Sequence, residues 1–328
     1  MKPVVWGVLS VSGHYELRVH TPIRNSALLT MRAVASRSMD KAAQAAKKLG
    51  IAKAYGSYEE LLRDPEIEAV YIPLPNHLHA QWVMKAADAG KHILCEKPFA
   101  MNAAETKEAI QYAQRKGVLV MEAFMYRLHP LWQRAKEIVA CGELGDVHAI
   151  QTYFTYSLFD PKNIRNILEA GGGAIPDIGC YAVNSARFLM GQEPERVVSL
   201  VSRDPAFKTD VLTSAILDFG RARALFTIGT QTFPMQEVNI FGSRGSLSLP
   251  GCFNIYPDVP VHMTATTSLG QRNVFTGPVD QYAVLFEGFS KAVRGEAPLP
   301  TPPEDAIANM RVLDALLKSE KSGQWEKV

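Results

Sequence analysis

Three residues that could bind an anion, Ser36-Arg37-Ser38, follow an apolar run at 29–35, and no acidic residue stands among them. A hydroxyl, a guanidinium and the N-terminus of the helix that Ser38 would cap all favour a dianionic phosphate. A solvated arginine beside a helix cap explains the same residues equally well. This segment alone leaves both interpretations open.

A second candidate loop follows the apolar run Val4–Leu9 and reads Gly7-Val8-Leu9-Ser10-Val11-Ser12-Gly13. A dinucleotide-binding fingerprint would have G-x-G-x-x-G here, with glycines that allow the backbone to approach a pyrophosphate. Small hydroxyl residues could also let the backbone approach and could donate hydrogen bonds to phosphate. Taken by itself, this loop is better explained as an ordinary turn from strand to helix.

A third loop comes directly after a buried run at 69–72 and reads Pro73-Leu74-Pro75-Asn76-His77-Leu78-His79. The prolines make the loop rigid, and Asn76 is expected to cap the helix that follows. His79 is an ordinary residue of that helix unless the loop lies over a ligand. In a parallel sheet, loops at the carboxyl ends of the strands share one crevice, where such folds bind ligands.

These loops belong to a regular alternation of predicted strands and helices in the first part of the chain. The predicted strands are at 4–9, 29–36, 69–72, 92–95 and 118–121. The predicted helices are at 38–49, 57–63, 79–89 and 103–116. Ser57 and Glu60 fit a capping box, and glycines follow several of the helices. This alternation predicts a mostly parallel sheet with helices on both faces.

The pattern changes after 130–140, where strands become longer and alternate in polarity or carry aromatic residues. These strands are predicted at 147–156, 197–202, 213–219, 222–230 and 237–241, with one helix at 181–189. They predict a second domain built on a large, mainly antiparallel open sheet, and the tail after Asp280 returns to helix.

Composition excludes several classes of partner. The chain has 328 residues, 47% of them apolar and 21% charged, with a formal net charge of +2, which gives no reason to expect nucleic acid or a membrane surface as partner. No apolar stretch is long enough to span a bilayer. The four cysteines lack disulfide or zinc-site spacing, so free thiols and a cytoplasmic location are expected. His77 and His79 lack the spacing of a helical zinc site, and no metal is expected.

Further motifs occur in a fixed order along the chain. Glu96-Lys97-Pro98 follows the strand at 92–95, P-x-P-N-x-x-H precedes it at 73–79, and G-G-G-A-x-x-D-x-G-x-Y ends at Tyr181. Together they resemble the glucose–fructose oxidoreductase / inositol dehydrogenase / MocA family over essentially the whole chain. The dihydrodiol dehydrogenase and D-xylose dehydrogenase branch is the most similar, on the residues Met121-Glu122-Ala123-Phe124-Met125-Tyr126-Arg127, His129-Pro130 and Asn163-Ile164-Arg165-Asn166.

The resemblance implies a Rossmann domain that binds NAD(P), which we expect at 1–124. It also implies a second domain with an open-faced sheet, expected at 125–328, which binds the substrate and often forms dimers. We therefore expect a homodimer or a higher homo-oligomer. NADP(H) is the preferred cofactor, because Ser36-Arg37 stands where an acidic residue would hold the ribose of NAD, and NAD(H) is possible.

The residues expected to bind the cofactor combine the three loops with the family motifs. They are Gly7, Ser10, Val11, Ser12, Ser36, Arg37, Pro73, Leu74, Asn76, His79, Glu96, Lys97 and Arg165. Arg165 matches a position that reaches toward the cofactor in some relatives. The chain departs from the family at Ser10 and Ser12, where relatives usually carry glycine.

By matching motif, Lys97 corresponds to the family's catalytic lysine and Asp177 to its substrate-positioning aspartate. Tyr181 stands where many members have histidine and the dihydrodiol-type branch has tyrosine. A tyrosine can act as base only if its pKa falls well below about 10, and the Lys97 ammonium would shift it in that direction. Which of the two transfers the proton stays open, and a coupled pair is expected.

Asp177 precedes Tyr181 by four residues, so both would share a face of a helix, and Asp177 is also expected to be that helix's N-cap. The residues expected to line the substrate pocket are Lys97, Phe124, Arg127, Asp177 and Tyr181. His129 is expected to be a structural histidine.

The sequence thus predicts an NADP-dependent oxidoreductase that transfers a hydride to or from a small sugar, polyol or trans-diol. One alternative is a reductase that works physiologically on a carbonyl sugar. Another is a non-catalytic, NAD(P)-binding regulatory protein, which the presence of Lys97, Asp177 and Tyr181 disfavours.

Overall fold

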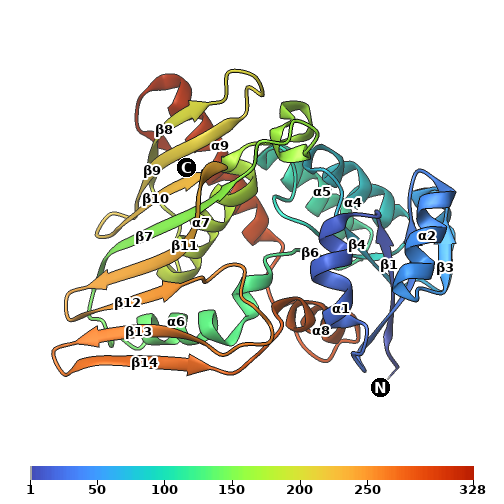
Figure 1. The fold of residues 1–328 in the computed structure, drawn as a ribbon, viewed down its shortest axis with the longest axis horizontal. Coiled ribbons are helices and arrows are strands. Elements are labelled where there is room, and N and C mark those ends of the chain that lie inside the picture. Colours follow the sequence, from blue (N-terminus) through green and yellow to red (C-terminus); the bar gives the residue numbers. More distant parts are fainter. Residues whose placement is uncertain (1) are drawn as a thin grey trace. The chain divides into compact units, whose positions relative to one another are not determined.

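The computed structural model describes residues 2–328, which divide into two compact units. One unit is the chain up to Met125 together with Gln281–Ile307, and the other is Tyr126–Asp280 together with Ala308–Val328 (Figure 1). Each unit contains one sheet.

The first unit holds a six-stranded sheet in the order β3-β2-β1-β4-β5-β6, with every strand parallel to its neighbours. The strands are β1 (Val4–Leu9), β2 (Leu29–Ala35), β3 (Lys53–Tyr55), β4 (Ala69–Ile72), β5 (His92–Cys95) and β6 (Val120–Glu122). This strand order is that of a Rossmann fold, so the predicted doubly wound parallel sheet is confirmed.

Of the first five helices of this unit, the last four begin and end close to where the sequence predicts, and the first lies where no helix bounds were predicted. They are α1 (His20–Ile23), α2 (Met39–Leu49), α3 (Tyr58–Arg63), α4 (His79–Asp88) and α5 (Ala103–Arg115). Ser38 Oγ accepts the N–H of Lys41, and Ser57 Oγ accepts the N–H of Glu60, as N-caps do. The second half of the predicted capping box is shifted, because the Glu60 carboxylate accepts the N–H of Gly56.

The predicted N-cap role of Asn76 is wrong. Asn76 begins a short 3₁₀ turn, Asn76–Leu78, and α4 begins after that turn, at His79. The extra turn forms because the Leu78 N–H bonds to the carbonyl of Pro75, which places Leu78, without a capping side chain, at the N-cap.

Helix α8 (Gln281–Val293) packs on the first sheet, although the sequence predicts this segment to belong to the second domain. Trp6 in β1 donates its indole N–H to Ser290 Oγ at 3.2 Å. Its ring lies 4.9 Å from that of Phe286 and 5.4 Å from that of Phe289. All four side chains are almost completely buried, so α8 completes the core of the first unit.

The second unit is built on a nine-stranded sheet in the order β14-β13-β12-β11-β7-β10-β9-β8-β15. Its strands are β7 (Val147–Ser157), β8 (Arg196–Arg203), β9 (Asp210–Asp218), β10 (Arg223–Gly229), β11 (Gln231–Gly242), β12 (Gly245–Pro250), β13 (Val261–Thr267), β14 (Gly270–Thr276) and β15 (Glu326–Lys327). Every neighbouring pair is antiparallel except β7 and β10, so the predicted, mainly antiparallel sheet is confirmed.

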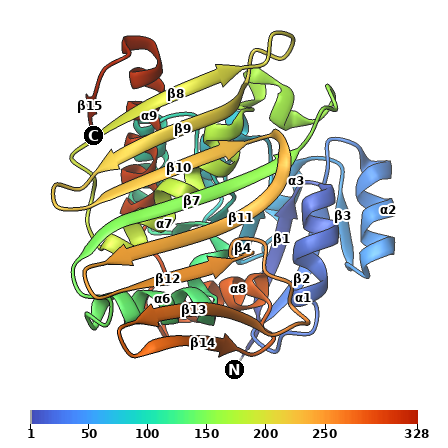
Figure 2. The same cartoon turned by 60° about the vertical axis from the view of Figure 1, so that its left-hand side comes forward.

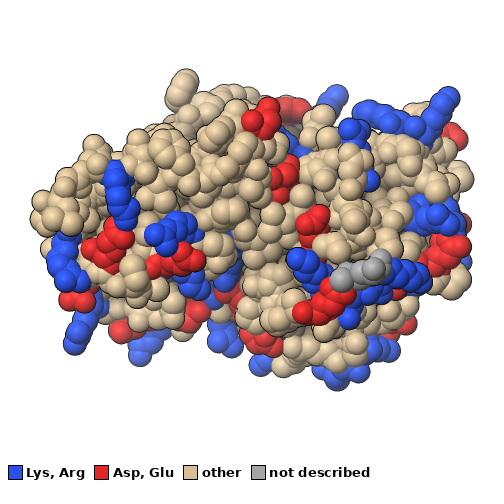
Figure 3. Space-filling model, turned by 90° about the horizontal axis from the view of Figure 1, so that it is seen from below, with Lys and Arg blue, Asp and Glu red and all other residues tan. Residues whose placement is uncertain are grey.

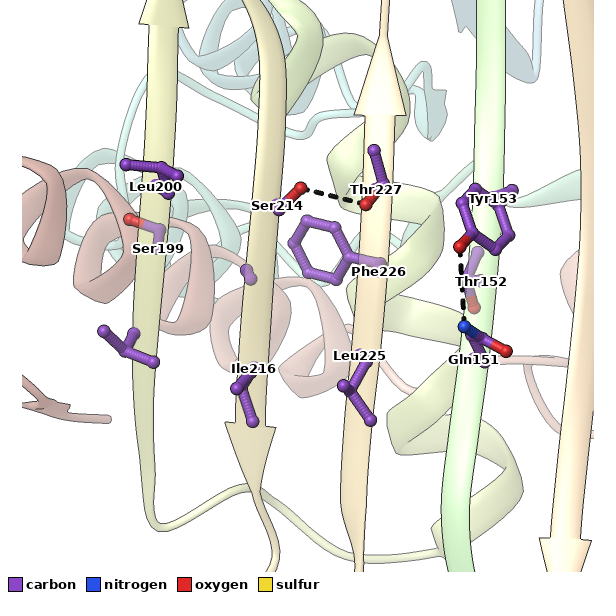
Figure 4. Close-up of a pocket in the computed structure, with 12 residues that line it drawn as sticks. Gln151, Thr152, Tyr153, Ser199, Leu200, Ser214, Ile216, Leu225, Phe226 and Thr227 are labelled. Carbon is purple, nitrogen blue, oxygen red and sulfur yellow. Dashed lines mark hydrogen bonds between the residues drawn. The ribbon is translucent and has the colours of Figure 1, made fainter.

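Helices α6 (Pro130–Ala140), α7 (Cys180–Met190) and α9 (Glu304–Ser322) cover one face of this sheet. Figure 2 shows the other face toward the reader, and no helix of this unit lies on it within the described residues. Figure 4 shows that the strands of this face bring together side chains such as Leu200, Leu225 and Tyr153. Phe226 and Thr152 alternate with them and are buried on the helix side.

The face drawn in Figure 3 carries charged side chains of both signs, with Lys and Arg beside Asp and Glu in several places on a mostly uncharged surface. No helix within residues 2–328 has both the length and the apolar character needed to cross a bilayer. The four cysteines, Cys95, Cys141, Cys180 and Cys252, are free thiols.

Candidate active site

The loop after β1 starts a helical segment at Ser12. The Oγ of Ser12 accepts the N–H of Tyr15 at 3.2 Å, and its carbonyl accepts the N–H of Glu16 at 3.1 Å. Ser10 and Val11 connect β1 to this helix start. Gly7 lies inside β1, where a Cβ would approach Leu61 Cδ2 to 2.7 Å, so its glycine serves close packing of strand and helix.

The loop after β2 presents a basic group beside a helix N-terminus. Ser36 is buried, and its Oγ accepts the N–H of Ser38 at 3.3 Å. Arg37 is exposed and makes no hydrogen bond or ion pair with any residue of 2–328. Its charge opposes the rise that burial causes in the pKa of Tyr58, so the guanidinium lies near that ring. The residues at this edge therefore fit a phosphate dianion.

The side chain of His79 contacts backbone carbonyls of two of the loops. It is fully buried, with Nδ1 2.8 Å from the carbonyl of Pro98 and Nε2 2.8 Å from the carbonyl of Leu74. Burial lowers the pKa of His79, although both carbonyls oppose that shift. A neutral imidazole has one N–H, so it donates to one carbonyl at a time. His79 therefore supports the Pro73–Leu78 and Glu96–Phe99 loops, with neither ring nitrogen left over for a ligand.

The turn that carries Lys97 is anchored on one side by Glu96. This carboxylate is buried and accepts the hydroxyl of Tyr71 at 2.6 Å and the backbone N–H of Lys97 at 3.3 Å. His14 Nε2 approaches it to 3.7 Å. Burial alone would raise the pKa of Glu96, but His14, Lys97 and Tyr71 together lower it below its usual value. Glu96 is therefore ionised at neutral pH.

A second carboxylate anchors the other side of the same turn. Glu122, at the end of β6, is buried and accepts the N–H of Phe99 at 2.8 Å. The Lys97–Pro98 peptide bond between the two anchors is cis. Two buried carboxylates thus accept backbone N–H groups of this turn, one at Lys97 and one at Phe99. These bonds fix the position of the Lys97 backbone, from which its side chain extends.

In the second unit, Asp177 is the centre of a three-residue polar group. Its Oδ2 accepts the hydroxyl of Tyr156 at 2.7 Å and the Nε–H of Arg165 at 2.9 Å. The carboxylate of Asp177 raises the pKa of Arg165, so the guanidinium stays charged. Burial, and then Asp177, raise the pKa of Tyr156, so this phenol stays a donor. The arrangement holds an ionised carboxylate in a fixed position.

The prediction that Asp177 caps the following helix is wrong. The backbone is already helical at Ala174, with φ −68° and ψ −40°, and a π-helical turn at Ile175–Gly179 runs directly into α7. Asp177 therefore lies inside a helical run, and its carboxylate bonds to the side chains of Tyr156 and Arg165.

Tyr181 lies in the first turn of α7 and is buried, with 5% of its surface exposed. Its ring packs among Tyr126, Phe154 and Phe253, with centroids 5.4 to 5.8 Å away. The charge of Arg165 interacts with Tyr181 as well as with Asp177, so the three side chains are neighbours.

The remaining predicted pocket residues have the following surroundings within their own units. Phe124 is buried and belongs to the first unit. The Arg127 guanidinium lies 4.8 Å from the ring of Phe188 and donates to Asn184 Oδ1 at 3.4 Å, both on later turns of α7. His129 is fully buried and caps α6 by accepting the N–H of Leu131, and burial lowers its pKa to about 4, which fits the predicted structural role.

Two side chains that support the candidate residues, one in each unit, were not predicted from the sequence. Tyr156 ends an aromatic strand and reads as a packing residue, because nothing nearby in sequence shows that it meets Asp177. Glu122 lies in the segment 121–127 that resembles the family, but its bond to Phe99 joins residues far apart in the sequence and leaves no local pattern.

Two protein-family models match the chain in order. A model described as "Oxidoreductase family, NAD-binding Rossmann fold" matches residues 6–124, and the GFO/IDH/MocA C-terminal domain matches residues 132–248. The chain belongs to the GFO/IDH/MocA oxidoreductase family.

Relatives within the GFO/IDH/MocA family include named enzymes. The chain is 43% identical over 336 residues to an uncharacterized oxidoreductase of Rhizobium meliloti, covering 100% of both. It is 40% identical over 294 residues to a D-xylose 1-dehydrogenase (NADP(+)) of Haloferax volcanii, covering 89% of this chain and 90% of that one. It is 34% identical over 223 residues to a trans-1,2-dihydrobenzene-1,2-diol dehydrogenase of Xenopus laevis, covering 66% of both. The predicted branch is confirmed.

Solved GFO/IDH/MocA-type structures share the fold of nearly the whole chain. KijD10, a 3-ketoreductase from Actinomadura kijaniata solved with NADP and TDP-benzene, matches with a TM-score of 0.91 and 26% identity over 97% of this chain and 98% of that one. An aldose–aldose oxidoreductase from Caulobacter crescentus matches with a TM-score of 0.90 at 24% identity, over 99% and 100%. The protein is therefore an oxidoreductase with an NAD(P)-binding Rossmann domain.

Proposed function

We propose that this oxidoreductase uses NADP(H) to interconvert a hydroxyl and a carbonyl on a small sugar, polyol or trans-diol, with an aldose such as D-xylose as the first candidate. The observation that carries the proposal is the carboxylate of Asp177, fixed by Tyr156 and Arg165 beside Tyr181. A fixed carboxylate is an acceptor for the several hydroxyls of such a substrate. The 40% identity to a D-xylose dehydrogenase over 89% of the chain supports the same choice.

The cofactor preference is argued from the loop after β2. Arg37 has no partner within residues 2–328, and it lies beside the N-terminus of α2 with the hydroxyl of Ser36 and no acidic residue between them. These groups would hold a 2′-phosphate, and they offer no carboxylate for the ribose hydroxyls of NAD. We therefore propose that NADP(H) is preferred, with NAD(H) as the weaker alternative.

The remaining cofactor contacts are proposed for the other loops of the same sheet edge. Ser10, Val11 and Ser12 would face the pyrophosphate at a helix start, while Pro73, Leu74, Asn76 and Glu96 would line the nicotinamide side. His79 acts through the two loops that it ties, and Gly7 acts through strand packing. Arg165 is proposed as a further cofactor contact, because it matches a position that reaches toward the cofactor in some relatives.

For the chemistry, we propose Lys97 and Tyr181 as a coupled proton-transfer pair, with Asp177, Phe124 and Arg127 contributing to substrate binding. When bound, NADP⁺ would supply the hydride acceptor for oxidation and NADPH the hydride donor for reduction. The substrate hydroxyl gives its proton to the pair as its carbon loses hydride, and the reverse reaction returns the proton. Tyr181 is buried among aromatic rings, so a phenolate there would depend on a nearby cation such as the Lys97 ammonium.

Two solved variants of the ketoreductase KijD10 support this pair. One replaces a tyrosine by phenylalanine and another replaces a lysine by alanine, and those two positions have the same separation along the chain as Lys97 and Tyr181.

We also propose a cytoplasmic homodimer or higher homo-oligomer. Leu200, Leu212, Leu225 and Phe241 lie on the uncovered face of the second sheet and are between 38% and 77% exposed. Apolar side chains gathered on one face usually mark an interface, and a second copy would bury them symmetrically. The four free thiols fit a reducing compartment.

A second candidate function is reduction of a keto sugar. Two relatives favour it, the ketoreductase KijD10 and a dTDP-3,4-didehydro-2,6-dideoxy-alpha-D-glucose 3-reductase of Streptomyces violaceoruber that is 35% identical over 68% of this chain. The same residues would serve this direction, with the proton moving to the carbonyl oxygen.

The test is a panel of substrates, with turnover measured by the absorbance of the reduced cofactor. Purified protein would be mixed with NADP⁺ or NAD⁺ and D-xylose, other aldoses, inositol or a trans-diol, and with NADPH and keto sugars for the reverse direction. We expect NADPH formation with at least one aldose, faster than NADH formation. Turnover with keto sugars alone would select the second candidate. Absence of turnover in both directions, with cofactor still bound, would refute the enzymatic proposal.

A further inference from the structure

The glycine-rich segment before Asp177 is shaped by a buried carboxylate from another strand. Gly173 has φ +131°, a value that favours glycine, and a Cβ there would lie 2.0 Å from Asp210 Oδ1. The space that a side chain at 173 would need is thus occupied by Asp210.

Asp210 is the first residue of β9 and is 3% exposed. Its Oδ2 accepts the N–H of Ile175 at 2.6 Å. Ile175 begins the turn at Ile175–Gly179 that carries Asp177 and continues into α7, where Tyr181 lies. The first N–H groups of a helical run have no partner within it, so a carboxylate bound there fixes where the run begins.

Asp210 forms no ion pair within residues 2–328. Arg203, at the end of β8, faces it, but Arg203 forms a bidentate pair with Glu320 of α9 at 2.6 and 2.7 Å. Tyr156 of β7 also interacts with it electrostatically. Burial raises the pKa of Asp210 to about 6, the Ile175 N–H and Arg203 oppose that rise, and Glu320 adds to it.

We propose that Asp210 is a positioning residue of the active site, whose carboxylate fixes the start of the 175–179 turn and thereby the places of Asp177 and Tyr181. Its effect on turnover rests on the proposed function, whereas its effect on the turn does not. An ionised carboxylate accepts a stronger hydrogen bond than a carboxylic acid. The turn is therefore held less firmly as pH falls through the pKa of Asp210.

The activity test compares two variants with the wild type, using NADP⁺ and D-xylose, or another aldose that the panel identifies. Asp210→Ala should lower kcat about ten- to a hundredfold with the KM for NADP⁺ unchanged, as expected when reacting groups are displaced. Asp210→Asn keeps an acceptor for Ile175 but cannot ionise. It should retain most of the kcat at about pH 8 and lose the acidic limb that the wild type shows near pH 6.

The second readout needs no turnover. Hydrogen exchange of the amides at 171–181 should be faster in Asp210→Ala, and unchanged in the matched control Asp218→Ala, which removes a buried carboxylate from the other end of β9. If the wild type turns over no substrate, the proposed function fails while this exchange still decides the inference.

Unchanged exchange in Asp210→Ala would overturn the inference, as would an acidic limb in Asp210→Asn identical to that of the wild type. Should Asp210→Ala not fold, the pH profile of Asp210→Asn decides it alone.

Discussion

The substitution Asp210→Asn is expected to change stability in a way that depends on pH. The pKa of Asp210 rises from 3.8 to about 6 on folding, because the carboxyl is buried. The folded protein then holds the proton more tightly than the unfolded chain does. The stabilisation that this gives is complete below the unfolded pKa and is lost as pH rises through about 6. Asparagine never ionises, so the free energy of unfolding of the variant does not fall over this pH range for that reason.

The magnitude follows from the size of the shift. Between about pH 4.5 and pH 8 the wild type should lose about 2 kcal/mol relative to Asp210→Asn, at about 1.4 kcal/mol for each unit of pKa. Urea unfolding of both proteins at several pH values measures it. The free-energy difference between the two proteins is the quantity to plot, because all other titrating groups cancel in it.

Asp218→Asn is the matched control for this measurement. A hydrogen bond from Arg196 lowers the pKa of Asp218, so its contribution is present above the unfolded pKa and is lost only at more acidic pH. The difference between this variant and the wild type should therefore stay nearly constant from about pH 5 to pH 8. A difference between Asp210→Asn and the wild type that is equally flat would refute the reasoning about Asp210.

Four other outcomes are expected. Arg37→Ala should weaken NADP binding about ten- to a hundredfold with little effect on NAD binding, because one charge-assisted contact is lost. Equal affinity of the wild type for both cofactors would contradict the assignment. Leu225→Lys should convert a dimer to a monomer in sedimentation at micromolar concentration, and a wild type that is already monomeric there would disprove the interface. Lys97→Met and Tyr181→Phe should each lower turnover about 10²–10⁴-fold while NADP still binds, and the double variant should be little worse; near-normal turnover in both single variants rules out the pair. His79→Ala should cost about 1–3 kcal/mol of unfolding free energy and weaken cofactor binding, whereas unchanged binding would show that the two loops do not need the tie.

The sequence was sufficient for the elements whose side chains are buried on both faces. β4 and β5 lie where they were predicted, because short apolar runs bounded by turn residues have few alternatives inside a parallel sheet. β3 was missed, since Lys53–Tyr55 is half-buried and carries no pattern. β12 and β13 were missed because serine and threonine occupy many of their half-exposed positions, and β14 was missed because it is mostly exposed and carries no apolar alternation.

The site divides in a similar way. Asp177 and Tyr181 stand in a motif that can be read along the chain, and the structure places them beside each other. Tyr156, which bonds to Asp177, comes from β7, and Asp210, which bonds to the N–H of Ile175, comes from β9. Only the register of the sheet decides which side chains on those strands reach the 175–179 turn. That register depends on long-range pairing, which a single sequence does not display.

The packing of α8 against Trp6 has a consequence for the order of events during synthesis. The Rossmann unit is discontinuous: its sheet is finished once Glu122 has been made, but the helix that covers Trp6 begins at Gln281. A nascent chain that ends anywhere between them would expose an indole and the apolar strand around it. Synthesis of the Rossmann unit therefore begins before that of the second unit, but its core is complete only after Gln281–Ile307 has been made. A fragment that stops at Met125 should aggregate unless a peptide of Gln281–Ile307 is added to it.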